Sequence, residues 1–348
     1  MAKILYLSCH EILQWDECNL LLELGHQVFC PGAYVSEENK GDLNLRPGLP
    51  KCENYDELME EWHKLGVPGK DNKECLTVDY VKRFDLVIVM HLPQWVHVNW
   101  ETFKKSGVPV VWRTIGQSVV HNEKEMAPHR AEGMKIIRYS PREQYIPGYL
   151  GGDAMIRFMK DPDEFCDWNG SIKEVVTFGQ HMQKRDPATN YAWFEYVTRP
   201  FPRKLFGPGS ETLPFGKGKV SYPDLKQAMR DYRAYFYTGT WPASYTLNFI
   251  EAMMTGIPMV CIGPAKGHPH GWFRGHDLYE PVDVIKNGIN GFCSDSDVEL
   301  RSYIKQLLDN ESLAKKISAA GRETAIALFG KEAVKRQWLE FLSSMGLI

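Results

Sequence analysis

The sequence predicts two α/β domains, each a parallel β-sheet with helices on both faces, and three observations lead to this prediction. The chain has 348 residues, which suits two domains better than one hydrophobic core. Short apolar runs alternate with helical stretches along most of the chain, as expected of strands buried on both faces. A stretch rich in Gly, Pro and aromatic residues at 141–170 interrupts the alternation, which marks a hinge between two domains.

The first domain begins with one βαβ unit. A buried strand at 3–8, a helix at 14–24 that ends at Gly25, and a second strand from His26 follow one another. A polar stretch at 31–73 comes next, and we expect it to be an insertion or lid outside the core, with a helical patch at 55–64. The remaining strands of this domain are expected at 84–91, 108–114 and 134–140.

The second domain has the same architecture without a visible sequence repeat. Its strands are expected at 174–179, 203–209, 234–239, 258–263 and 291–294. Its helices are expected near 187–197, 223–231, 246–255, 297–308 and 311–328. A last helix with apolar residues at helical spacing is expected at 331–345.

Composition and charge are those of an ordinary globular protein. The net charge is −3, so binding to nucleic acid or to an anionic membrane would need a local basic groove. The 8 cysteines are scattered without a pair at metal-binding spacing, which fits a reduced, cytoplasmic setting, the host cytoplasm if the chain is viral. The first residues lack the pattern of a signal peptide, and no stretch approaches the length of a membrane span.

The loop and helix after the strand at 234–239 have the features of a diphosphate site. In open parallel sheets, ligands bind beyond the carboxyl ends of strands, where helix N-termini offer backbone N–H groups. The hydroxyls of Ser244 and Thr246 stand at such a terminus. Glu251, five residues into the helix, can accept hydrogen bonds from two ribose hydroxyls. Taken alone, these residues are better explained as helix caps and a solvated carboxylate.

The longer string IEAMMTGIPMV, followed by VIKNGINGF, favours the diphosphate site over the interpretation as helix caps. In these motifs the chain resembles the family-four glycosyltransferases of the GT-B fold, closely over roughly 174–342 and more loosely before it. The resemblance implies two facing Rossmann-like domains. It implies an acceptor-binding domain at 1–165, a nucleotide-sugar-binding domain at 166–330, and a helix at 331–348 that crosses back to the first domain.

The resemblance also implies the contacts of the donor. Glu251 is expected to bind the ribose, and the backbone of Ser244, Tyr245, Thr246 and Leu247 to lie against the phosphates. A UDP-sugar is the expected co-substrate, with no cofactor and no metal.

Two further segments match the family's donor site. FGQHMQKR supplies Gly179 and the cations Lys184 and Arg185, with Gln180 in place of the usual Arg. One of these cations is expected to stabilise the leaving diphosphate, because a site without a metal needs positive charge there; the competing interpretation is surface charge on a loop. LFGPGSE supplies Gly207 and Gly209 of a glycine loop near the base.

One position departs from the family pattern. Ala243 stands where the family carries a Glu that touches the donor sugar. Three explanations stay open: a different donor sugar, a substitute such as Trp241 or Ser244, or lost activity. The acidic string 294–297 resembles a metal-binding motif, but its place before a helix predicts that Ser296 or Asp297 is a cap.

The first domain is expected to supply the acceptor side. His91 and Arg113 are catalytic candidates by location only, because the family's usual His or Asp after the fourth strand is absent. The further acceptor-side candidates at strand ends are His10, Thr114, Gln117 and Arg138. Family members retain the anomeric configuration, which agrees with the lack of an obvious general base.

Sequence similarity also points to an acceptor. WRTIGQ, IRYS, DAMIRFMKDP and YTGTWPASYTL look similar to glycosyltransferases encoded by phages, some of which modify hydroxymethylated bases in DNA. Cations and aromatic residues that suit a DNA backbone and an extruded base are Arg113, Lys124, Arg130, Lys135, Arg138 and Arg142, with Trp112, Tyr139 and Tyr145. An ordinary solvated surface over core aromatics explains the same residues equally well.

Several functions therefore stay open at this stage. The first is a retaining transfer of a sugar to 5-hydroxymethylcytosine in DNA, and the second is transfer to a glycan, glycolipid or small molecule. From other classes, a nucleotide-sugar epimerase or an inactive nucleotide-sugar-binding protein would share the fold. The oligomeric state is not predicted.

Overall fold

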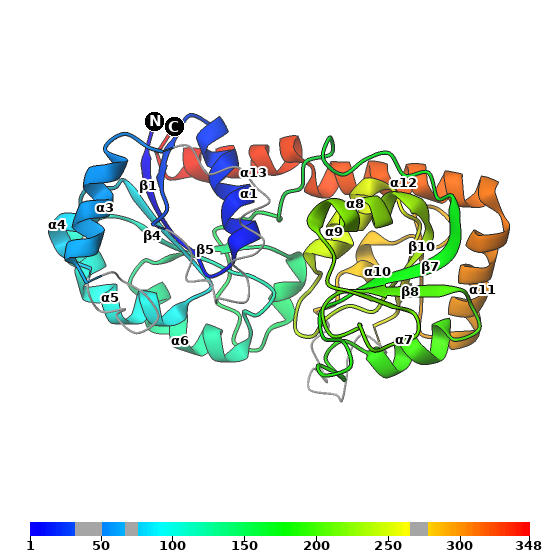
Figure 1. Ribbon diagram of the computed structural model, residues 1–348. Helices are drawn as coiled ribbons and strands as arrows, with labels where there is room; N and C mark the ends of the chain where they lie inside the picture. The colour runs from blue at the N-terminus through cyan, green and yellow to red at the C-terminus, as the bar shows by residue number, and fades with distance from the viewer. Residues whose placement is uncertain (32–50, 67–75, 265–277) are drawn as a thin grey trace. The chain divides into compact units, whose positions relative to one another are not determined.

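The computed structural model describes residues 1–31, 51–66, 76–264 and 278–348. The chain forms two compact units (Figure 1). The first unit comprises Met1–Met159 and Val334–Ile348, and the second comprises Lys160–Ala333. Each unit contains its own parallel β-sheet, so the predicted class of two Rossmann-like α/β domains is confirmed.

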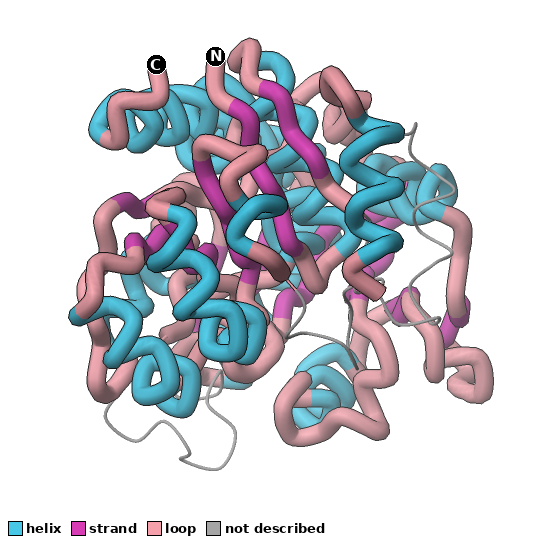
Figure 2. The backbone as a smooth tube through the Cα atoms, turned by 90° about the vertical axis from the view of Figure 1, so that its left-hand side faces the viewer, coloured by secondary structure: helices cyan, strands magenta, loops and turns pink. Residues whose placement is uncertain are grey.

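The first unit has a sheet of 6 strands in the order β2-β1-β3-β4-β5-β6, with every neighbouring pair parallel. Its strands are β1 (Lys3–Leu7), β2 (Gln27–Phe29), β3 (Leu86–Met90), β4 (Val110–Arg113), β5 (Lys135–Arg138) and β6 (Ala154–Met155). Its helices are α1 (Glu11–Glu23), α3 (Tyr55–Lys64), α4 (Val78–Val81), α5 (Pro93–Ser106), α6 (Val120–Ala131) and a 3-10 turn η2 (Pro141–Tyr145). In Figure 2 this unit faces the viewer, and helices lie on both sides of its strands.

The strands of the first unit are continuous apolar runs because both faces of the sheet are covered. All 5 residues of β3, LVIVM, are buried, as expected of a central parallel strand. The helix that follows begins with Pro93 in its first turn and ends at Gly107, whose φ of 73° is the left-handed conformation that closes many helices. The predicted strand positions in this unit are confirmed.

The helix α3 corrects one prediction. The stretch at 31–73 was expected to lie outside the core, but Leu58 and Trp62 of α3 are buried in the main hydrophobic cluster of the first unit. The indole of Trp62 stacks on Trp95, with ring centroids 6.3 Å apart. Most residues of the segment are polar, so its sequence did not show that these two residues form one buried face of the helix. The parts of the stretch at 32–50 and 67–75 lie outside the described residues.

The stretch predicted as a hinge contributes to the first unit. Its residues include η2 and the edge strand β6, and Phe158 and Met159 are buried. The boundary between the units falls at Met159 and Lys160. The helix α13 (Lys331–Ser344) begins in the second unit, and its residues from Val334 onward group with the first.

The second unit has a sheet of 6 strands in the order β12-β11-β10-β7-β8-β9, again parallel throughout. Its strands are β7 (Ile172–Phe178), β8 (Arg203–Phe206), β9 (Gly216–Gly218), β10 (Tyr232–Tyr237), β11 (Met259–Ile262) and β12 (Phe292–Ser294). Its helices are α7 (Tyr191–Thr198), α8 (Tyr222–Asp231), α9 (Leu247–Thr255), α10 (Pro281–Val284), α11 (Asp297–Asp309) and α12 (Glu311–Phe329). Figure 1 shows α8 and α9 on the other side of the strands from α7.

Ser296 is the N-cap of α11, where its side chain accepts a hydrogen bond from the Glu299 amide. The prediction that the acidic string at 294–297 caps a helix is therefore confirmed. Among the described residues, no three His, Cys, Asp or Glu side chains gather as metal ligands. None of the described helices is both long enough and apolar enough to cross a membrane.

Candidate functional site

The strand order of the second unit fixes where a ligand can bind. The chain leaves β7 toward β8 and β9 on one side, and the later strands β10, β11 and β12 build the other side. The order therefore reverses between β7 and β10, which is where open α/β sheets bind ligands, beyond the carboxyl ends of the strands. Gly179 follows β7, and Thr238 follows β10, at this edge.

The glycine loops after β7 and β8 pack directly on each other. A Cβ on Gly207 would lie 2.2 Å from the carbonyl oxygen of Gly179, and φ at Gly207 is +130°. A Cβ on Gly209 would lie 2.7 Å from Nδ1 of His181, whose backbone N–H donates to the Pro208 oxygen at 2.7 Å. Only glycine permits this approach, so Gly207 and Gly209, predicted from the motif, hold the two loops together.

The helix α9 begins beside these loops. Its N-cap residue Thr246 makes no capping side-chain hydrogen bond; instead its hydroxyl lies 3.1 Å from the Tyr237 hydroxyl and hydrogen-bonds Asn248. The side chain of Asn248 donates to the Phe178 oxygen at 2.8 Å, which joins the start of α9 to the end of β7. The first amides of a helix have no intrahelical acceptor, so Leu247 and Asn248 present N–H groups at this edge.

A third loop is fastened to the same edge. The side chain of Asn190 donates to the Thr238 oxygen at 3.0 Å, and the Thr238 hydroxyl donates to the Thr189 oxygen at 2.8 Å. The backbone N–H of Trp241 donates to the Ala188 oxygen at 2.7 Å. The segment after β10, which carries Ala243, is therefore held against the segment that carries the candidate cations.

The predicted cations lie on that exposed segment. Gln180, Lys184 and Arg185 are all exposed, and the Arg185 guanidinium reaches back to the Gln180 oxygen at 3.3 Å. A lysine on an exposed turn keeps its side-chain freedom, and its ammonium is a flexible point charge that suits a phosphate. The role of Lys184 and Arg185 stays a prediction.

The remaining predicted donor residues are buried. Ser244 and Tyr245 are enclosed; the Ser244 oxygen accepts a hydrogen bond from the Glu280 amide at 3.0 Å, and the Tyr245 ring packs edge-on against Phe329. They shape the loop through packing.

Glu251 has an ionic partner that its motif does not contain. Its Oε1 lies 2.9 Å from Nζ of Lys160, and the two side chains are 6% and 1% exposed. The carboxylate is therefore held as part of a buried ion pair in the second turn of α9. Its predicted role at the ribose is not tested by this geometry.

The first unit has its own strand-order reversal, between β1 and β3. His10 follows β1 and caps α1, where its side chain accepts from the Leu13 amide at 3.4 Å. His91 follows β3 with φ of 65°, and its Nδ1 lies 3.3 Å from the Ser118 hydroxyl. Burial lowers the pKa of His91 to about 4, so at neutral pH the ring is an uncharged hydrogen-bonding group.

Arg113 and Thr114 lie in the core of the first unit. The Arg113 guanidinium is 0% exposed and bonds Oε1 of Glu17 through Nε at 2.9 Å and Nη2 at 2.6 Å. The Thr114 hydroxyl donates to the Ile137 oxygen at 3.2 Å. These contacts tie β4 to α1 and β5, and burial argues against direct contact with an acceptor. Gln117, in contrast, is exposed on the turn after β4.

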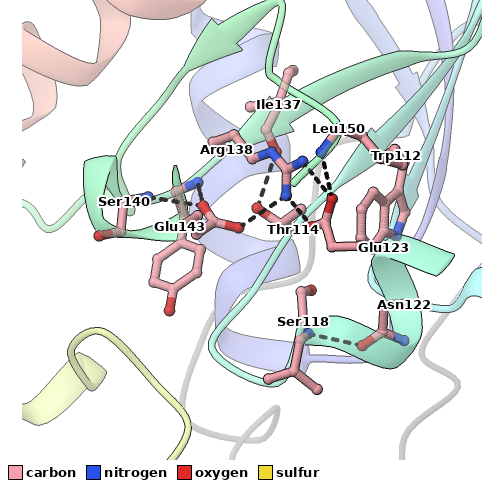
Figure 3. A network of polar contacts seen from close by, with 12 residues as sticks. Trp112, Thr114, Ser118, Asn122, Glu123, Ile137, Arg138, Ser140, Glu143 and Leu150 are labelled. Carbon is pink, nitrogen blue, oxygen red and sulfur yellow. Dashed lines mark hydrogen bonds and ion pairs between the residues drawn. The ribbon is translucent and has the colours of Figure 1, made fainter. Parts of the chain in front are cut away.

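Arg138 stands at the centre of a second buried network (Figure 3). Its guanidinium binds both carboxylate oxygens of Glu123 and the Gly151 oxygen at 2.8 Å, and it lies 3.6 Å from Oε1 of Glu143. Burial raises the pKa of the Glu143 carboxyl, and the Arg138 charge opposes this shift. This network holds the turn after β5. Arg138 is 2% exposed, so its side chain has a structural role.

Most of the cations suggested for a DNA groove form ion pairs with carboxylates of the protein. Arg130 and Lys135 both pair with Asp153, while Arg113 and Arg138 are buried in the pairs described above. Trp112 and Tyr139 are buried in the core. Exposed members of the set are Lys124 and Tyr145. The charge pattern in the sequence thus comes mostly from neutralised cations and core aromatics.

Several residues of these two sites escaped prediction from sequence. Lys160 and Glu123 lie far in sequence from their partners Glu251 and Arg138, and no local pattern links the members of either pair. Asn248 lies between the two quoted motifs, and its contact with the Phe178 backbone oxygen has no sequence pattern. Tyr237 carried a signal, because it lies near the carboxyl end of the strand expected at 234–239.

Solved structures of similar fold are known, whereas two other comparisons matched nothing. No protein-family model matches the chain, and no curated protein matches it. Among solved structures, HepE from Anabaena, in complex with UDP and glucose, superimposes with a TM-score of 0.68 at 14% identity over 99% of this chain and 100% of that one. A glycosyltransferase from Rickettsia africae gives 0.66 at 14% identity, covering 99% and 98%.

TarM gives a TM-score of 0.58 at 17% identity over 78% of this chain and 58% of its own. These similarities confirm the GT-B fold predicted from the sequence motifs.

Proposed function

We propose that the protein is a glycosyltransferase that transfers a sugar from a UDP-sugar to a hydroxyl group. The observation that carries the proposal is the pair of glycine loops beside the start of α9, at the strand-order reversal of the second unit. Packed glycines bring backbone N–H groups close to a ligand, and a helix N-terminus attracts a diphosphate. The similar HepE structure contains UDP and glucose, which supports the same class of donor.

We propose one role for each group at this edge of the sheet. The amides of Leu247 and Asn248 bind the diphosphate, Glu251 accepts from the ribose, and Lys184 or Arg185 stabilises the negative charge on the departing oxygen. Family resemblance supports retention of the anomeric configuration. Proton NMR of the product, which separates α from β linkages, tests retention directly.

The first unit favours an uncharged acceptor. Its sheet edge carries His10 and the neutral His91, whereas four of the cations suggested for DNA are paired with carboxylates. We therefore propose a glycan or small-molecule hydroxyl as the acceptor and place 5-hydroxymethylcytosine DNA second. The test incubates the protein with radiolabelled UDP-sugars and four acceptors: hydroxymethylated DNA, plain DNA, oligosaccharides and glycolipids. Label that appears only on hydroxymethylated DNA would overturn this order.

The donor proposal has a direct binding test. Calorimetry is expected to show UDP binding more tightly than ADP or GDP, and Glu251→Gln is expected to weaken UDP binding by about 1–3 kcal/mol, the scale for a charged hydrogen bond. Failure of all nucleotide diphosphates to bind would refute the proposal.

Mass analysis of the sugar nucleotide separates the other classes of function. An epimerase changes the donor without an acceptor, and an inactive protein with Ala243 binds the donor without changing it.

A further inference from the structure

The buried ion pair of Lys160 and Glu251 lies at one end of the proposed donor site. Leu247, Asn248 and Glu251 share one face of α9, because residues three and four apart are neighbours on a helix. Leu247 and Asn248 carry the first amides of this helix, and Glu251 lies one turn further in. The carboxylate is thus on the same side of the helix as the groups assigned to the diphosphate.

Lys160 is fixed in place by its backbone. Its N–H donates to the Phe329 oxygen at 3.0 Å, and the residue pairs with Gly330 in an isolated parallel bridge. Phe329 is also the residue on which Tyr245 of the donor loop packs, with ring centroids 5.2 Å apart. Lys160 and the donor loop therefore share one anchor at the end of α12.

Glu251 is buried, and a buried carboxylate needs a cation beside it. Tyr235, which lies near Glu251 from β10, carries no positive charge. Arg322 of α12 contacts the same helix but donates to the backbone oxygen of Met254. Lys160 is the cation in contact with the carboxylate among the described residues.

We propose that Lys160 is a positioning residue of the donor site: its ammonium holds one carboxylate oxygen of Glu251 in place, so that the other accepts hydrogen bonds from the donor ribose. The inference rests on the proposed function, because it assumes that Glu251 binds the ribose. It adds a residue 91 positions away in sequence (251 − 160), outside the donor motif.

The test compares the full-length protein with Lys160→Gln, which keeps a hydrogen-bond donor and removes the charge. The dissociation constant of UDP is measured at pH 7, and each value is divided by that of the unmodified protein. The ratio for Lys160→Gln is expected to be about ten, because a carboxylate without its ionic partner no longer presents a fixed oxygen to the ribose.

Two controls define the result. Lys226→Gln removes an ammonium 3.1 Å from Glu164 in a partly exposed pair of the same unit, and its ratio is expected to stay near one. Lys160→Arg keeps the charge, so its ratio is expected to be smaller than that of Lys160→Gln. A ratio near one for Lys160→Gln would show that the pair only stabilises the fold.

A ligand variant isolates the ribose. Removing both ribose hydroxyls, as in 2′,3′-dideoxyuridine diphosphate, is expected to weaken binding strongly in the unmodified protein and much less in Lys160→Gln. Lys160→Arg, whose longer side chain displaces the carboxylate, is expected to show a reduced preference for the hydroxyls; full preference would contradict positioning even if Lys160→Gln does not fold. If the unmodified protein does not bind UDP at all, the proposed function fails instead.

Discussion

At the scale of single residues, the side chains that looked functional divide into two groups. Arg113 and Arg138 are enclosed by carboxylates, Glu17 and Glu123, and stabilise the sheet of the first unit. His91 and Gln117 lie at the same sheet edge without such a pair. The division follows from burial: a guanidinium in the core needs a carboxylate beside it, whereas a neutral imidazole can be partly buried at lower cost.

The Arg138 network gives a prediction for stability. Arg138→Met leaves Glu123 and Glu143 buried without their cation, and we expect a loss of about 3–5 kcal/mol in the free energy of unfolding. The matched control, Arg130→Met, breaks a partly exposed pair with Asp153 and is expected to cost at most about 1 kcal/mol. Urea denaturation measures both; equal losses would mean that the buried network is no stronger than the surface pair.

His91 gives a prediction for pH. Its pKa is about 4 in the folded protein and about 6.5 in an unfolded chain, so between these values the unfolded state binds the proton first. Stability associated with His91 is therefore complete above pH 6.5 and is lost as pH falls toward 4, by up to roughly 3 kcal/mol. Urea denaturation at pH 7 and pH 4 should show a smaller loss for His91→Asn, which tolerates the positive φ.

The control for this effect is His121→Asn, since His121 is 75% exposed. It should lose as much stability between pH 7 and pH 4 as the unmodified protein. If His91→Asn also loses as much, the buried imidazole is not the source of the acid sensitivity.

At the scale of elements, the proposed donor site depends on loops that support one another. The loops after β7 and β8 meet through glycines, and the loop after β10 is bound to the segment after β7 by Asn190, Thr238 and Trp241. Such a site has little tolerance for added atoms, because backbone on one loop fills the space that a side chain on the next would need.

Gly207→Ala tests this dependence. The new Cβ would overlap the Gly179 backbone, so we expect the two loops to separate, UDP affinity to fall at least tenfold, and stability to drop by about 1–3 kcal/mol. Gly288→Ala is the matched control, because Gly288 has φ of +73° with nothing within 4 Å of a Cβ. Like Gly207 it has a positive φ, but a Cβ there would overlap no neighbour. Calorimetry and denaturation should therefore separate the two variants, and similar UDP affinities would contradict the packing argument.

At the scale of the whole molecule, the chain forms two units with separate cores, and its C-terminal segment packs into the first unit. Residues Val334–Ile348 belong to the first unit, where Trp338 and Leu342 are fully buried. The second unit carries the whole proposed donor site within Lys160–Ala333. Stability of the first unit and donor binding by the second can therefore be changed independently.

Trp338→Ala is expected to reveal this independence. Loss of a fully buried indole costs about 3–5 kcal/mol, and hydrogen exchange should become faster in β1, β3 and β4 while UDP affinity stays within twofold. Tyr196→Ala, at a side chain that is 50% exposed in the second unit, should leave exchange in the first unit unchanged. Loss of UDP binding in Trp338→Ala would show that the two units do not act separately.

The sequence by itself determined the fold class, nearly every strand, and the glycines and helix N-terminus of the donor site, because these depend on local periodicity and on backbone conformations that few residues adopt. It could not reveal that α3 packs into the core, since two buried residues among polar ones carry a weak signal. Only the tertiary structure decided which charges are paired. The paired residues come from distant parts of the chain: Lys160 with Glu251, Arg113 with Glu17, and Arg138 with Glu123. Ionic partners depend on proximity in space and on shared burial, and a local sequence pattern shows neither.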